Sequence, residues 1–222
     1  MSFPAKRIFR ENGLSIVVLG VFFVCFLGGQ IITGRSKYND ERAQRGSEKL
    51  GYRAYLKSPH FVEATAENWE SEFLQMGVFV FATAFLYQKG SAESKDPRKR
   101  HRHHSTRGVT PDSPWPVRRG GWVLRVYEHS LSLAFLILFS IAFVLHANGG
   151  RLLFNEERLA EGEPPLSLTG YLTSSRFWFE SFQNWQSEFL AIGCMVVLSI
   201  FLREANSPES KKVQTPHWEN EE

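Results

Sequence analysis

The sequence predicts an all-α membrane protein with four transmembrane helices, arranged as two parallel tandem repeats of a two-helix unit. The hydrophobic residues of the 222-residue chain gather in four blocks separated by polar stretches, which lower the mean hydropathy to −0.24. Aromatic residues are numerous, with 19 Phe and 6 Trp, as is typical of a lipid-facing surface with interfacial anchors. The two halves of the chain also match each other in sequence.

The four predicted spans differ in length. A helix needs about 20 apolar residues to cross a hydrocarbon core of ~30 Å. Residues 14–33 and 130–150 satisfy this without a charged side chain, whereas the apolar runs at 73–88 and 189–202 are shorter. We therefore expect the second and fourth helices to follow long polar loops and to begin before these runs. In the first half, Ser58 and Pro59 form a good N-cap and first-turn pair.

An internal repeat becomes visible when the chain is shifted by 116 residues against itself. The shift aligns Asn68-Trp69-Glu70-Ser71-Glu72-Phe73-Leu74 with Asn184-Trp185-Gln186-Ser187-Glu188-Phe189-Leu190. Two spans return the chain to its starting side, so both repeats have the same orientation and form a pseudo-two-fold bundle. The predicted boundaries are residues 1–95 for the first repeat, 96–122 for a basic connector, 123–211 for the second repeat and 212–222 for a polar tail.

The distribution of basic residues predicts the orientation in the membrane. The N-terminal flank and the connector lie on one side of a four-span protein, and both are rich in Lys and Arg. The loop after the third span carries more acidic than basic residues, and the loop after the first span is mixed. The positive-inside rule then places both termini and the connector in the cytoplasm of a multi-pass plasma-membrane protein.

The connector is expected to contact the lipid bilayer. Its basic residues are interleaved with three histidines, but cationic neighbours oppose metal binding and no cysteine or carboxylate completes a ligand set. We therefore expect neither a metal site nor nucleic-acid binding there. A polybasic segment next to a span instead predicts contact with anionic lipid headgroups through Arg98, Lys99, Arg100 and Arg102.

Two acidic residues form the candidate site. Glu72 and Glu188 occupy equivalent places in the repeated motif, about one helical turn after its tryptophan. A carboxylate inside a membrane usually faces the bundle interior, so the sequence predicts a paired-carboxylate site for a proton, a cation or a basic group. Alternatively, both carboxylates lie at headgroup depth and stabilise the helix N-termini. The interfacial anchors of the motif are expected to be Trp69, Trp185, Asn68 and Asn184.

Small residues inside the apolar blocks are expected to serve packing. Cys25 and Cys194 are interpreted as small buried hydrophobes, not as a disulfide or a metal pair. Gly28, Gly77 and Gly193 are expected to allow neighbouring helices to approach closely.

Three segments resemble a family of bacterial membrane proteins that carries only a domain-of-unknown-function label. They are the Glu11 to Ser15 start, the Asn-Trp-Glu-Ser-Glu-Phe-Leu motif, and the Gly-Ser-Ala-Glu-Ser-Lys-Asp-Pro segment that ends the first repeat. The second repeat departs from the pattern at Gln186 and at His129-Ser130. The resemblance covers the whole chain and implies a bacterial plasma-membrane protein, with no activity and no catalytic residues to transfer.

The expected function is a non-catalytic integral membrane protein, either an accessory or scaffolding subunit of a membrane complex or an envelope factor. No catalytic motif is visible, so we expect neither an enzyme nor a cofactor. The alternative is a small transporter or channel that uses Glu72 and Glu188. Four spans make a thin pore, so that alternative requires a homo-oligomer.

The predicted topology is tested by cysteine labelling in a background that lacks Cys25 and Cys194. In intact cells, an impermeant thiol reagent is expected to label cysteines placed at Ser47 and Gly162, because both positions lie in the predicted outer loops. A cysteine at Ser105 in the connector is expected to stay unlabelled until the membrane is opened. Labelling of the Ser105 position from outside would reverse the orientation.

Overall fold

A computed structural model describes residues 4–95 and 108–220, and within these residues all regular secondary structure is helical. The predicted all-α class is therefore confirmed. The connector residues Arg98, Lys99, Arg100 and Arg102 lie outside the described residues, so the lipid-headgroup contact remains a prediction. The chain forms two compact units, each of which draws on both halves of the sequence. Unit 1 comprises Met1–Ala66 and Leu145–Thr173, and unit 2 comprises Glu67–Val144 and Ser174–Glu222.

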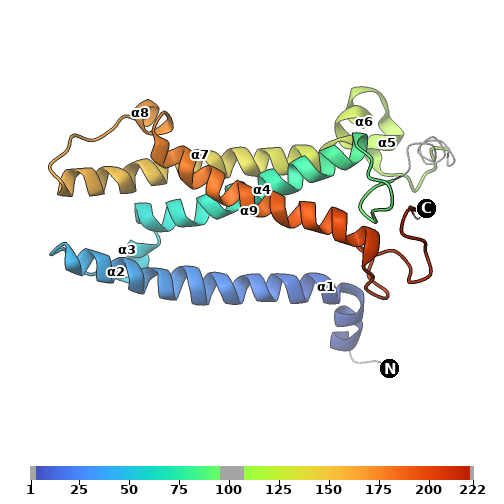
Figure 1. Cartoon of the computed structure of the whole chain (residues 1–222), viewed down its shortest axis with the longest axis horizontal. Helices are drawn as coiled ribbons and strands as arrows, with labels where there is room; N and C mark the ends of the chain where they lie inside the picture. Colours follow the sequence, from blue (N-terminus) through green and yellow to red (C-terminus); the bar gives the residue numbers. More distant parts are fainter. Residues whose placement is uncertain (1–3, 96–107, 221–222) are drawn as a thin grey trace. The chain divides into compact units, whose positions relative to one another are not determined.

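The first helical stretch is longer than its apolar block. Helix α1 (Pro4–Val24) bends at Asn12 and continues through the π-helix η1 (Cys25–Thr33) into α2 (Gly34–Gln44) (Figure 1). The prediction of a polar loop directly after residue 33 is therefore wrong. Residues 35–44 contain no proline or glycine and are rich in Arg, Lys, Glu, Ala and Gln, which favour helix even where the chain has become polar.

The third apolar block behaves in the same way. After the short helices α5 (Trp115–Arg119) and α6 (Gly121–Glu128), α7 runs from Ser130 to Ala160, ten residues beyond the predicted end at residue 150. The part of α7 up to Val144 belongs to unit 2, and the part from Leu145 belongs to unit 1. The short helices α3 (Tyr52–Tyr55) and α8 (Leu168–Leu172) interrupt the polar segments that follow.

The remaining long helices begin where the sequence predicts. Helix α4 (Pro59–Phe85) starts after Ser58, whose hydroxyl accepts a hydrogen bond of 3.2 Å from the Phe61 amide. Helix α9 (Ser175–Phe201) starts after Ser174, whose hydroxyl accepts one of 3.4 Å from the Phe177 amide. Such caps satisfy amide groups that have no partner within the helix.

Among the described residues, three helical segments are long and apolar enough to cross a membrane: Lys6–Gln44, Ser130–Ala160 and Ser175–Phe201. Helix α4 is also long, but the four carboxylates between Glu63 and Glu72 make its N-terminal half polar. Composition therefore supports a membrane protein.

Two asparagines hold the polar segments of unit 1 in the same way. The side chain of Asn39 receives a hydrogen bond from the Leu50 amide (2.7 Å) and donates one to the Leu50 carbonyl (3.0 Å). Asn155 does the same with Leu166, at 2.7 and 2.9 Å. We call each arrangement an Asn clamp. The two clamps lie 116 residues apart, which is the spacing of the sequence repeat.

Buried tyrosines accompany the Asn clamps. Tyr55 is fully buried, and its hydroxyl donates to the Gln30 carbonyl of η1 at 3.1 Å. A side chain at Gly34 would collide with this hydroxyl, and a side chain at Gly150 would collide with that of Tyr171. Glycine is thus required at both positions by the close approach of a tyrosine, and the two pairs again lie 116 residues apart.

The packing expectations for the other small residues are partly wrong. Gly77 does allow close approach, because a Cβ there would lie 3.3 Å from the Phe135 Cβ, but nothing lies within 4 Å of a Cβ at Gly28 or Gly193. Cys25 and Cys194 are free and exposed, so the prediction that they are buried is wrong. Both lie on apolar helix faces, and the sequence alone does not say which side of an apolar helix packs inward.

The Asn clamps generate a stability prediction. Replacing Asn39 or Asn155 with Ala removes two hydrogen bonds and leaves backbone groups of a partly buried leucine without their partner, which costs about 1–3 kcal/mol. We expect each variant to unfold at a lower temperature in detergent than the parent chain. Asp40→Ala changes an exposed neighbour of Asn39 and serves as the control. Equal melting temperatures for Asn39→Ala and Asp40→Ala would show that the clamp contributes nothing.

Candidate functional site

In unit 2, the repeated motif of α9 is joined to acidic residues of α4. The Asn184 side chain donates a hydrogen bond to the Glu67 carboxylate at 2.6 Å, and the Trp185 indole donates one to the Glu70 carboxylate at 3.2 Å. Glu70 is fully buried, so this indole partner offsets part of the free energy needed to bury its carboxylate. The motif therefore ties two helices together through polar side chains.

The structure locates the predicted site residues as follows. Glu72 is exposed and Glu188 is half-buried, and the Glu72 carboxylate acts electrostatically on that of Glu188. The Gln75 side chain donates to the Glu188 backbone carbonyl at 3.0 Å. Both carboxylates belong to unit 2, but whether they hold a ligand stays a prediction.

The predicted anchors fall into two groups. Asn184 and Trp185 are half-buried and bonded to α4, whereas Asn68 and Trp69 are exposed. Their anchoring role at the membrane interface remains a prediction. The pairing with Glu67 and Glu70 is an additional role that the motif alone did not reveal.

The end of unit 2 is closed by the C-terminal segment. The Asn220 side-chain nitrogen, with its two N–H groups, lies 2.8–3.1 Å from the carbonyl oxygens of Gln88, Ser91 and Ser94, and the side-chain oxygen accepts from the Gly90 amide at 2.7 Å. The loop after α4 is thus wrapped around one buried amide side chain. The loop after α9 repeats part of this geometry, because Ser210 caps the Glu204 amide at 2.8 Å just as Ser94 caps the Gln88 amide.

A carboxyl group with an unusual pKa lies in the same loop. Desolvation by burial, together with the nearby Glu209 carboxylate, raises the pKa of Glu93 to about 7. One oxygen of Glu93, Oε1, is buried without a hydrogen-bond partner. Glu93 and Glu209 lie at equivalent places in the repeat, so the loops bring two like carboxylates together.

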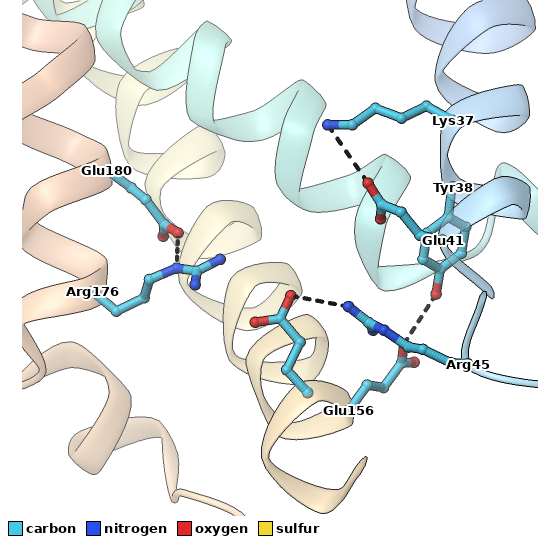
Figure 2. Close-up of polar contacts among 8 residues, drawn as sticks. Lys37, Tyr38, Glu41, Arg45, Glu156, Arg176 and Glu180 are labelled. Atoms are coloured by element: carbon cyan, nitrogen blue, oxygen red, sulfur yellow. Dashed lines mark hydrogen bonds and ion pairs between the residues drawn. The ribbon is translucent and has the colours of Figure 1, made fainter. Parts of the chain in front are cut away.

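Unit 1 contains a separate polar and aromatic cluster. The Tyr38 hydroxyl donates to the Glu156 carboxylate at 3.0 Å, and Arg45 forms an ion pair with Glu157 at 3.7 Å (Figure 2). The His60 ring stacks on Tyr38 with ring centroids 4.6 Å apart. Desolvation by burial lowers the pKa of His60, and its Nδ1 is buried without a hydrogen-bond partner. This cluster links the polar ends of α2, α4 and α7 within unit 1.

A carboxylate and an imidazole also meet inside unit 1. Glu63 of α4 and His146 of α7 are both buried, and their ligand atoms lie within 4.8 Å of each other. A nearby imidazole suits a buried carboxylate, which needs a polar or cationic neighbour.

The model of the DUF6766 family, a domain of unknown function, matches residues 5–222. The chain belongs to this family. The predicted resemblance to an uncharacterised domain family is therefore confirmed over nearly the whole chain. Neither the curated proteins nor the solved structures include a match to this chain.

Sequence reasoning missed most of the buried polar residues. It singled out Glu72 because its partner in the repeat is also Glu, whereas the buried carboxylate of the motif is Glu70. Residues two apart on a helix point in different directions, so Glu70 and Glu72 cannot share one face. Glu63, Ala66 and Glu70 follow helical spacing, and all three are buried on one face of α4. The Asn220 contacts had no sequence signal, because the tail reads as a polar terminus.

The raised pKa of Glu93 predicts a pH-dependent stability. Folding favours the protonated carboxyl, so its contribution to stability is complete at a pH below the usual range of a glutamate and is lost as the pH rises through about 7. We expect Glu93→Gln to reduce the fall in melting temperature between about pH 5 and about pH 7. Glu161→Gln, which changes an exposed carboxylate, should keep the parent profile. Parallel profiles for the parent and Glu93→Gln would contradict the assignment.

Proposed function

We propose that this protein is a non-catalytic integral membrane protein that acts as an accessory or scaffolding subunit of a membrane complex, or as an envelope factor. One observation carries the proposal. Within the apolar windows of the three candidate spans, 0%, 17% and 11% of residues are buried inside the chain. The helices therefore present their apolar side chains outward, where lipid and the helices of partner proteins pack.

The use of the buried polar residues also supports this function. Asn39, Asn155 and Asn220 bind backbone groups of the chain's own loops, and Glu70 binds the Trp185 indole. These contacts fix helix ends and loops, as a scaffold requires. These four side chains are therefore occupied in holding the fold.

The proposed topology has four spans in two parallel tandem repeats, with both termini in the cytoplasm of a bacterial plasma membrane. The matched Asn clamps, the matched Gly–Tyr approaches and the matched serine caps, each 116 residues apart, support the repeat. In this proposal α4 is the remaining span, and its polar N-terminal half lies in the interface. The basic connector then contacts anionic headgroups.

A small transporter or channel is the second candidate. The electrostatic effect of Glu72 on Glu188 favours it, because two carboxylates near each other attract a cation or a proton. That function needs a homo-oligomer to surround a pathway.

Photo-cross-linking in the native membrane tests the proposed function. We expect a cross-linker at Val18, an exposed residue on the apolar part of α1, to capture a second polypeptide in stoichiometric yield. The same cross-linker at Ser47 in a polar segment is the control and should capture much less. The adduct should co-purify in mild detergent with a defined larger complex. Recovery of only homo-oligomers from Val18 would reject the accessory role and favour the transporter.

A further inference from the structure

Unit 2 contains an apolar groove with a volume of about 690 Å³. One wall is a face of α4 that runs from Phe73 to Phe85, and the other is a face of α6 and α7 that runs from Arg125 to Phe139. Phenylalanine, leucine and valine side chains make up most of both walls. Several of these side chains are exposed, so the groove opens at the surface of unit 2.

The contacts between its walls define the direction of the groove. Gly77 approaches the Phe135 Cβ, and the rings of Phe73 and Phe135 are 6.5 Å apart. Helix α4 and the first part of α7 run antiparallel within unit 2 (Figure 1). The Phe85 end of α4 therefore lies beside the start of α7, and the Phe73 end lies beside Phe139. The two helices approach each other closely at Gly77 because this residue has no side chain.

The two ends of the groove differ in polarity. Arg125 and His129 lie one helical turn apart at the start of the second wall, and Ser132 follows in the first turn of α7. Leu133, Leu136 and Phe139 continue the wall toward the apolar end. Glu128 lies between the basic residues in sequence but is not among the residues that line the groove. One end is thus positively charged and the rest is apolar.

We propose that this groove binds one acyl chain of an anionic phospholipid, whose phosphate contacts Arg125 and His129. The α4 wall covers 12 residue steps, or about 18 Å at the helical rise, which is close to half of a ~30 Å hydrocarbon core. An acyl chain of one leaflet therefore fits its length. Arginine is well suited to a phosphate, because its planar guanidinium donates several hydrogen bonds.

A lipid fits the groove better than a partner helix does. Helix–helix interfaces in membranes favour small residues that allow close backbone approach. Apart from Gly77 and Ser132, this groove is lined by larger side chains, and its basic end would need a matching anion on any helix that entered. A phospholipid supplies the apolar chain and the anion in one molecule. The inference requires membrane residence and is independent of the proposed scaffolding role.

Native mass spectrometry of the purified full chain tests the proposal. The probes are phosphatidylglycerol and phosphatidylcholine with identical acyl chains, added to the protein in detergent. We expect one phosphatidylglycerol per chain to be retained, roughly tenfold more tightly than phosphatidylcholine, because the choline cation of the latter offsets the attraction between its phosphate and Arg125. Arg125→Gln should abolish the preference, and Arg118→Gln, an exposed arginine on α5, should keep it.

Tryptophan substitutions that fill the groove distinguish lipid bound there from lipid bound elsewhere on the protein. Leu133→Trp should lower retention of both lipids about tenfold, whereas Leu138→Trp, at a position of similar exposure (41% against 39%) outside the groove, should not. Val78→Trp fills the groove from the α4 wall and replaces Leu133→Trp if that variant does not fold. Replacing Arg98, Lys99, Arg100 and Arg102 with Gln should leave the retained lipid in place.

Several results would overturn the proposal. Equal retention of both lipids by the parent chain would show that the basic end does not select a headgroup. Unchanged retention in both groove-filling variants would place the lipid elsewhere. A chain dimer that disappears in Leu133→Trp would show that a second copy occupies the groove. Loss of binding only in the connector variant would assign the lipid to the connector.

Discussion

The constraint on which this fold depends is that burying a polar group in or beside an apolar span costs free energy unless the group finds a partner within the protein. Glu70 is fully buried on α4 and receives the Trp185 indole hydrogen bond from α9. The neighbouring Glu67 receives the Asn184 amide in the same way. Apolar side chains gain little by leaving lipid for each other, so such polar pairs determine which helix faces meet. The apolar faces that take no part in these polar contacts are left on the outside of the spans.

The two hydrogen bonds join helices that are equivalent in the proposed repeat, α4 and α9, through different side chains. At the contact, α4 carries acceptors at Glu67 and Glu70, and the equivalent positions of α9 carry Gln183 and Gln186. The asparagine and tryptophan of the second motif supply the donors.

The sequence predicted the helical class, the starts of α4 and α9 and the family, because caps and apolar blocks are local signals. It did not predict that α2 and the end of α7 continue as helix, since hydropathy marks membrane depth and says little about where a helix ends. Nor did it identify the Asn clamps, whose partners lie 11 residues away along segments that read as ordinary polar loops. The role of such an asparagine can be recognised only in the folded structure, where the backbone groups that it binds lie next to it.

Two pairs of glutamates occupy matching positions in the two halves of the chain. Glu93 and Glu209 interact, as do Glu72 and Glu188, and the members of each pair are 116 residues apart. In the proposed two-fold repeat, equivalent residues near the axis would face each other, and both pairs are consistent with that arrangement. Two like carboxylates that lie near each other repel. At Glu93 the repulsion is relieved because the raised pKa lets the carboxyl keep a proton at a pH where glutamate is normally ionised. The basic end of the groove is formed by Arg125, which belongs to neither carboxylate pair.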